Sequence, residues 1–135
     1  MAFMEWSTEL ELGFEEIDRQ HRWLLDATNA LHDEIQKGNP DRERLNLLIG
    51  GLAIYARNHF AAEERLFKRY QYPQGEAHHQ EHANFTAVVR DWKLRQDTGE
   101  TLGQEVLGFL RDWLLHHILK SDKAYVPFLK QHGVK

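Results

Sequence analysis

Histidine and glutamate residues at helical spacing are the side chains of this sequence with the clearest capacity for chemistry. His59 and Glu63 lie four residues apart in HFAAEERLF, and His78 and His82 have the same spacing in HHQEH. Four residues make just over one helical turn, so each pair shares a helix face. Both residue types bind metal ions, and phenylalanines around His59 indicate burial, where charge is costly unless paired or metal-bound. Either pair alone is equally compatible with a solvent-exposed helix face.

Three further residues extend this pattern to the rest of the chain. His21 stands in IDRQHRWL, and His117 and Asp122 stand in HHILKSD. In a regular helix a spacing of five rotates Asp122 about 140° away from His117, so they meet only through a local π-type widening or a long-reaching carboxylate. Taken singly, His21 could be a surface histidine, His117 a core histidine bonded to the backbone, and Asp122 an exposed acid. The remaining histidines fall outside the pattern and receive no role: His32, His79, His116 and His132.

The candidate ligands together suit two metal ions better than one. They comprise five histidines and two carboxylates: His21, His59, Glu63, His78, His82, His117 and Asp122. Imidazole-rich sites with carboxylates favour iron, although ligand type also admits zinc, manganese and copper. Two roughly octahedral ions offer about twelve positions. With both carboxylates and an oxo or hydroxo group as bridges, one position stays open for a small ligand.

Four helix-like segments with short connections predict an all-α fold. The expected helices run over about Asp18–Lys37, Asp41–Tyr70, Glu76–Gln96 and Leu102–Gln131. The stretches GNPD, YQYPQG and DTGET separate them, and no segment shows sustained strand alternation. Because short connections make neighbouring helices antiparallel, the sequence predicts an up-down-up-down four-helix bundle, in whose core metal ligands from facing helices can meet.

The ends of the chain carry separate expectations. Residues 1–17 are expected to form an ordered, extended N-terminal arm rather than a helix, with Trp6 and Phe14 as its anchors. Near the other end, Pro127 should end or kink the last helix, because proline lacks the backbone donor that a helix needs. The length of 135 residues suits one domain that spans residues 1–135.

Composition excludes several classes of protein. The absence of cysteine excludes disulfides, thiolate metal sites, iron–sulfur clusters and covalently attached c-type haem. A formal net charge of −4 gives no basic footprint for nucleic acid. No apolar run approaches membrane-spanning length, and the start of the chain lacks a basic segment followed by an apolar one. We therefore expect a cytoplasmic protein with neither a nucleic-acid nor a membrane partner.

The strings around the candidate ligands resemble a known family. IDRQH, HFAAEE, YPQGEAHHQEH and WLLHHILKSD are similar to the hemerythrin family, and within it to the single-domain bacteriohemerythrins. The resemblance spans nearly the whole chain, and a pattern of seven ligands is highly specific. A four-helix bundle of up-down-up-down topology is also the architecture that this family implies.

The resemblance implies that the ligands divide between the two ions of an oxo- or hydroxo-bridged iron pair. One iron would take His78, His82 and His117 and be coordinatively full, and the other would take His21 and His59 and keep the open position. Glu63 and Asp122 would bridge the two. A dioxygen pocket would be lined by Phe60, Trp113, Leu114 and Ile118. The implied function is reversible dioxygen binding by a carrier, storage or delivery protein that is not an enzyme.

Two other functions stay open on the sequence. A di-iron oxidase or peroxide-forming enzyme would use a bundle of this kind, but the carboxylate-rich di-iron proteins use four glutamates and two histidines. The neutral imidazoles of the present set favour reversible binding instead. An oxygen- or iron-sensing module normally needs an output domain, for which 135 residues leave no room. Dioxygen is the expected partner, an oxygen-using enzyme is a candidate recipient, and nothing demands more than a monomer.

Overall fold

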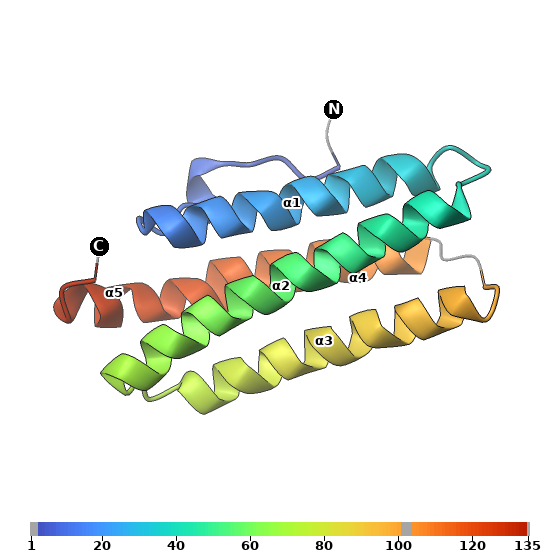
Figure 1. The fold of residues 1–135 in the computed structure, drawn as a ribbon. Helices are drawn as coiled ribbons and strands as arrows, with labels where there is room; N and C mark the ends of the chain where they lie inside the picture. The colour runs from blue at the N-terminus through green and yellow to red at the C-terminus, as the bar shows by residue number, and fades with distance from the viewer. Residues whose placement is uncertain (1–2, 101–103, 135) are drawn as a thin grey trace.

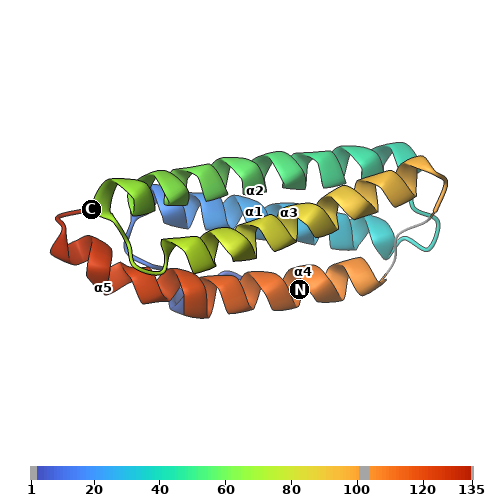
Figure 2. The same ribbon diagram turned by 90° about the horizontal axis from the view of Figure 1, so that it is seen from below.

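The computed structural model describes residues 3–100 and 104–134, and in these ranges the chain is helical with no strand. Four long helical segments run antiparallel, the first beside the second, the second beside the third, and the fourth beside the first (Figure 1). The fourth of these helical segments continues without a break through a π-helical stretch (Figure 2). The elements are a 3₁₀ turn Thr8–Leu10, α1 (Glu15–Ile35), α2 (Arg42–Tyr70), α3 (Gly75–Asp97), α4 (Gln104–His116), the π segment His117–Asp122 and α5 (Lys123–Gln131). The expected all-α, up-down-up-down bundle is confirmed.

Local side-chain contacts explain where the first helices begin. Asp41, where the sequence placed the start of the second helix, caps α2, since its carboxylate accepts a hydrogen bond from the backbone N–H of Arg44 at 3.1 Å. α1 begins at Glu15 rather than Asp18, because the Asp18 carboxylate reaches back and accepts the N–H groups of Leu12 and Gly13 at 2.8 and 3.2 Å. The Asp18 carboxylate therefore ties the preceding loop onto the first turn of α1.

The last helical segment ends at Gln131, as expected. Of the two effects expected of Pro127, an end or a kink, the structure excludes the end, because α5 continues through this residue. The expected start of this helical segment at Leu102 lies outside the described residues, and α4 is helical from Gln104. Within the described ranges, every helix is too short or too polar to span a bilayer.

The N-terminal arm is ordered along the first helix (Figure 1). Met4 is buried, and its backbone N–H and C=O bond to the amide of Asn29 at 2.7 and 2.8 Å. Phe14 is buried as expected of an anchor, whereas Trp6 is half-buried beneath the guanidinium of Arg22, 4.7 Å from its ring centre. The arm extends the apolar interior along the outside of α1.

The core consists of two apolar clusters with a polar layer between them. The larger cluster holds Leu24, Leu52, Phe60 and Ile118 among others, and the smaller holds seven residues of the opposite end: Leu12, Phe14, Ile17, Phe67, Tyr72, Tyr125 and Leu129. In sequence, His21 falls between Ile17 of the smaller cluster and Leu24 of the larger, and the ligands of α3 fall between Tyr72 of the smaller and Phe85 of the larger. The hydrophobic ends thus fix the helices whose polar residues meet in the middle.

Candidate metal centre

Five imidazoles and two carboxylates meet in the layer between the two apolar clusters. Each of the four helical segments contributes side chains to this layer. They are His21 from α1, His59 and Glu63 from α2, His78 and His82 from α3, and His117 and Asp122 from the π segment. All are at most 3% exposed, an extent of burial that charged and polar residues tolerate only with partners. The structure therefore brings together every residue that the sequence selected as a ligand.

The ligand atoms form two overlapping groups. The three-histidine set consists of His78, His82 and His117 with Glu63. The two-histidine set consists of His21 and His59 with Glu63 and Asp122. Within each set, one nitrogen or oxygen of every residue lies within 4.8 Å of those of the others. Each set is compact enough to surround one metal ion, and Glu63 belongs to both.

Asp122 lies between the two sets and turns one oxygen to each. Its Oδ1 is 2.8 Å from Nε2 of His78 and 3.0 Å from Nε2 of His117. Its Oδ2 is 2.8 Å from Nε2 of His21 and 3.8 Å from Nε2 of His59. A carboxylate with its oxygens divided in this way has the geometry of a bridge.

The π segment explains how residues five apart point to one centre. His117–Asp122 is π-helical, and both end residues are buried. A π-helix bonds each residue to the fifth along, so it places residues i and i+5 on the same side, where an α-helix separates them. Of the two explanations that the sequence spacing left open, a π-type widening and a long-reaching carboxylate, the structure shows the widening.

Glu63 is held by a tyrosine that the sequence pattern did not single out. Its Oε1 lies 3.1 Å from Nε2 of His82 and 3.3 Å from Nε2 of His59. Its Oε2 accepts a hydrogen bond of 2.6 Å from the hydroxyl of Tyr125, whose side chain is fully buried. Tyr125 follows Asp122 by three residues, so helical spacing alone could have suggested it.

An outer layer of polar side chains orients some of the imidazoles. Nδ1 of His82 donates to Oε2 of Glu64 at 2.8 Å. Nδ1 of His117 donates to Oε1 of Glu81 at 3.1 Å. Nδ1 of His59 faces the amide oxygen of Gln20 at 2.7 Å. A bond at Nδ1 leaves Nε2 as the nitrogen with the free lone pair, the form that a metal ligand needs.

The donor atoms fit metal ions better than they fit one another. Nε2 of His21 lies 3.0 Å from Nε2 of His59, so two nitrogens face each other. In the described part of the chain, Nε2 of His78 and Oδ1 of Asp122 are buried without a well-directed hydrogen bond, although only 2.8 Å separates them. Buried polar atoms are rarely left in this state. A cation within each set would satisfy these donors, and imidazole with carboxylate suits iron.

Opposite charges hold protons on part of the metal-free cluster. Burial alone would lower the pKa of His78, but the carboxylates of Asp122 and Glu63 outweigh it and raise the pKa to about 9. Burial alone would likewise raise the pKa of Asp122, but the nearby charge of His117 holds it well below its usual range. His59 differs, because burial dominates and lowers its pKa. Metal ions would have to displace the protons on the charged imidazoles.

Two of the residues expected around dioxygen stack on histidines, and the other two are buried in the larger apolar cluster. The Phe60 ring stacks on His82, with 3.9 Å between ring centres and 8° between planes. The Trp113 ring stacks on His117 at 4.4 Å and 14°. Leu114 is buried within the larger apolar cluster, to which Phe60 belongs. Ile118 is fully buried there too.

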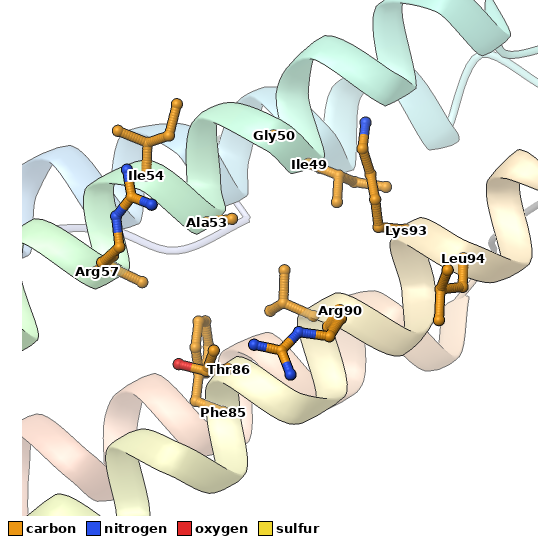
Figure 3. A pocket seen from close by; sticks show the side chains of 12 residues that line it. Ile49, Gly50, Ala53, Ile54, Arg57, Phe85, Thr86, Arg90, Lys93 and Leu94 are labelled. Atoms are coloured by element: carbon orange, nitrogen blue, oxygen red, sulfur yellow. The ribbon is translucent and has the colours of Figure 1, made fainter.

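An open groove elsewhere on the bundle is separate from this centre. It lies between α2 and α3 and has a volume of about 340 Å³ (Figure 3). Buried apolar residues such as Ile49, Phe85 and Val89 line it together with the cationic side chains of Arg57 and Arg90. No candidate ligand or expected dioxygen-pocket residue is among its lining residues.

The histidines adjacent to the candidate ligands lie outside the cluster. His79 precedes Gln80 on α3 with its side chain exposed, and its Nδ1 contacts Oε1 of Glu64 at 2.7 Å. His116 ends α4 and is exposed, whereas the next residue, His117, is buried. The sequence register of the ligand pattern therefore agrees with the structure.

The chain is a four-helix bundle whose antiparallel helices surround two overlapping, buried sets of histidine and carboxylate. This arrangement is consistent with a binuclear metal site. Residues 12–129 match the family model described as the Hemerythrin HHE cation binding domain. The chain belongs to the hemerythrin family, as its motifs indicated.

Similar proteins agree with this assignment over almost the full length. The bacteriohemerythrin of Stenotrophomonas maltophilia is 33% identical over 98% of this chain and 85% of that protein. The bacteriohemerythrin of Methylococcus capsulatus is 35% identical over 96% of this chain and 98% of that protein. A crystal structure of wild-type hemerythrin superposes with a TM-score of 0.87 at 32% identity, covering 93% of this chain and 97% of that one.

Proposed function

We propose that this protein holds two iron ions in the buried cluster and binds dioxygen reversibly. The observation that carries the proposal is the convergence of five imidazole Nε2 atoms and two carboxylates on two compact, overlapping sets. Membership of the hemerythrin family supports iron as the metal. Bound iron would supply the electrons for reversible dioxygen binding, and the chain would supply ligands and a dry surrounding.

The proposed ligands divide as the two sets do. His78, His82 and His117 would hold one ion, and His21 and His59 would hold the other. Glu63 and Asp122 would serve both ions, together with an oxo or hydroxo bridge. The opposite orientation of the two Asp122 oxygens supports this role, since each lies 2.8 Å from a histidine of a different set. We place the open coordination position on the ion of the two-histidine set, because that set has fewer histidines.

Apolar residues would keep water from the centre. We assign the wall of the dioxygen pocket to Phe60, Trp113, Leu114 and Ile118. Three of them are at most 4% exposed, and Trp113 covers one face of His117. A wall of this kind limits the entry of water and protons, which would otherwise favour irreversible oxidation of the metal.

A carrier fits the residues better than an oxidase does. The neutral imidazoles outnumber the carboxylates in the cluster, whereas carboxylate-rich di-iron enzymes have the opposite balance. The relatives are named bacteriohemerythrins. A cytoplasmic location, a monomeric state and delivery to an oxygen-using enzyme complete the proposal as predictions from the sequence.

The test is iron analysis combined with visible spectra of the reconstituted protein under alternating nitrogen and air. We expect two iron ions per chain and a spectrum that cycles repeatedly without bleaching. His117→Ala should abolish the cycle, while His116→Ala is the matched control, because His116 is exposed and adjacent in sequence. Release of peroxide with loss of colour in the first cycle would favour the oxidase, and absence of iron would end both proposals.

A further inference from the structure

The two histidine sets differ in what supports them from outside. On the three-histidine side, Nδ1 of His82 and of His117 donate to the carboxylates of Glu64 and Glu81, at 2.8 and 3.1 Å. Glu81 is itself fixed, because the hydroxyl of Ser121 donates to it at 2.7 Å. On the two-histidine side, Nδ1 of His59 faces the neutral amide oxygen of Gln20 at 2.7 Å instead of a carboxylate.

His21 has no such support at all. Within the described residues, its Nδ1 is buried without a hydrogen-bond partner. Its Nε2 lies 2.8 Å from Oδ2 of Asp122 and 3.0 Å from Nε2 of His59. A neutral imidazole that binds a metal through Nε2 carries its proton on Nδ1, and there the described residues offer His21 no acceptor. An unsatisfied buried hydrogen-bond donor costs free energy, so we expect His21 to bind a metal ion more weakly than a histidine with an acceptor at Nδ1.

Aromatic packing adds to the difference. The Phe60 and Trp113 rings stack nearly parallel on His82 and His117, at 8° and 14° between planes. His21 instead meets His59 edge to face, with 72° between the rings. Imidazoles held both at Nδ1 and across a ring face lose less freedom on binding a metal, because they are already ordered.

We propose that Glu64 and Glu81 are positioning residues that make the three-histidine set fill with metal before the two-histidine set. A carboxylate at Nδ1 makes the imidazole a more basic ligand, fixes its tautomer and adds negative charge beside the cation. Both carboxylates act on the same set, and the shared Glu63 and Asp122 do not distinguish the two. The inference rests on the proposed binuclear centre, but concerns the order and strength of metal uptake rather than dioxygen.

The first test locates one equivalent of metal in the wild-type protein. Metal-free protein is supplied with one equivalent of Co²⁺, and crystals are measured with anomalous scattering at the cobalt edge. We expect the peak beside His78, His82 and His117. Equal peaks in both sets, or a peak beside His21 and His59, would overturn the inference and leave the metal centre intact. No cobalt in the cluster would overturn the proposed function as well.

The second test follows Co²⁺ uptake by visible absorption in variants that retain all the proposed ligands. Glu64→Gln and Glu81→Gln should each weaken binding of the first ion by about 10–100-fold, the usual effect of losing an outer partner. Binding of the second ion should change far less. Glu76→Gln is the matched control, because Glu76 is an exposed glutamate of α3 whose carboxylate accepts a hydrogen bond from the amide of Gln80 at 3.0 Å, away from the candidate ligands.

The same titration separates positioning from a general effect on the fold. Gln20→Ala should weaken the second ion alone, since Gln20 supports His59 in the other set. Equal weakening of both ions by Glu64→Gln, or no weakening by either glutamine variant, would contradict the assignment. Glu64 and Glu81 are half-buried at the edge of the bundle, and far-UV circular dichroism verifies that each variant is folded.

Discussion

Tyr125→Phe isolates one buried hydrogen bond of the centre. The hydroxyl donates to Oε2 of Glu63 at 2.6 Å, and both side chains are fully buried. Tyrosine and phenylalanine have nearly the same shape, so the substitution removes the donor with little change in packing. A hydrogen bond to a charged group contributes about 1.5–3 kcal/mol, and its loss leaves a buried carboxylate oxygen without that donor. We therefore expect the free energy of unfolding of the metal-free protein to fall by that amount.

Urea denaturation of the metal-free protein, followed by circular dichroism, measures this change. Tyr55→Phe is the matched control, because Tyr55 lies on α2 with 43% of its surface exposed. The control should change stability by less than about 0.5 kcal/mol, as surface substitutions usually do. Equal free energies for the two variants would refute the role given to the Tyr125 hydroxyl in holding Glu63.

Four other perturbations test different parts of the account. Metal removal should lower the melting temperature, because it leaves buried polar groups unpaired; equal melting of metal-free and loaded protein would count against a buried centre. Glu63→Ala should impair retention of the second iron, and unchanged iron content would refute its bridging role. The Zn²⁺ affinity of the metal-free protein, measured by competition with a chelator, should rise with pH up to about 9. Below that pH, His78 holds a proton that the metal must displace. A Zn²⁺ affinity that does not change with pH would contradict this. Leu110→Ala, in the fully buried core, should cost about 2–5 kcal/mol in urea denaturation and leave metal content unchanged, while Leu47→Ala, 68% exposed, should cost far less.

The spacing of residues was enough to predict most of the fold and the set of clustered side chains. His59 with Glu63, and His78 with His82, each share a helix face at a spacing of four, and both pairs point into the core as expected. Helix ends followed from local chemistry at Asp41, which caps α2. These features depend on interactions within a few residues, which a sequence displays directly.

Other features depend on contacts between distant parts of the chain. Two explanations for the spacing of His117 and Asp122 were open, and only the structure identifies the π-helix. Gln20 meets His59 across 39 positions, and single polar residues of this kind leave no periodic signal. The start of α1 at Glu15, three residues before the expected start, is a local feature that the sequence pattern did not show.

We propose that seven side chains in the middle of the bundle hold two iron ions. Anomalous diffraction at the iron edge from crystals of the reconstituted protein tests this proposal most directly. We expect two peaks inside the cluster, one beside the three-histidine set and one beside His21 and His59, with Asp122 between them. Crystals of iron-treated protein without any peak in the cluster, or with iron bound only at the surface, would contradict it.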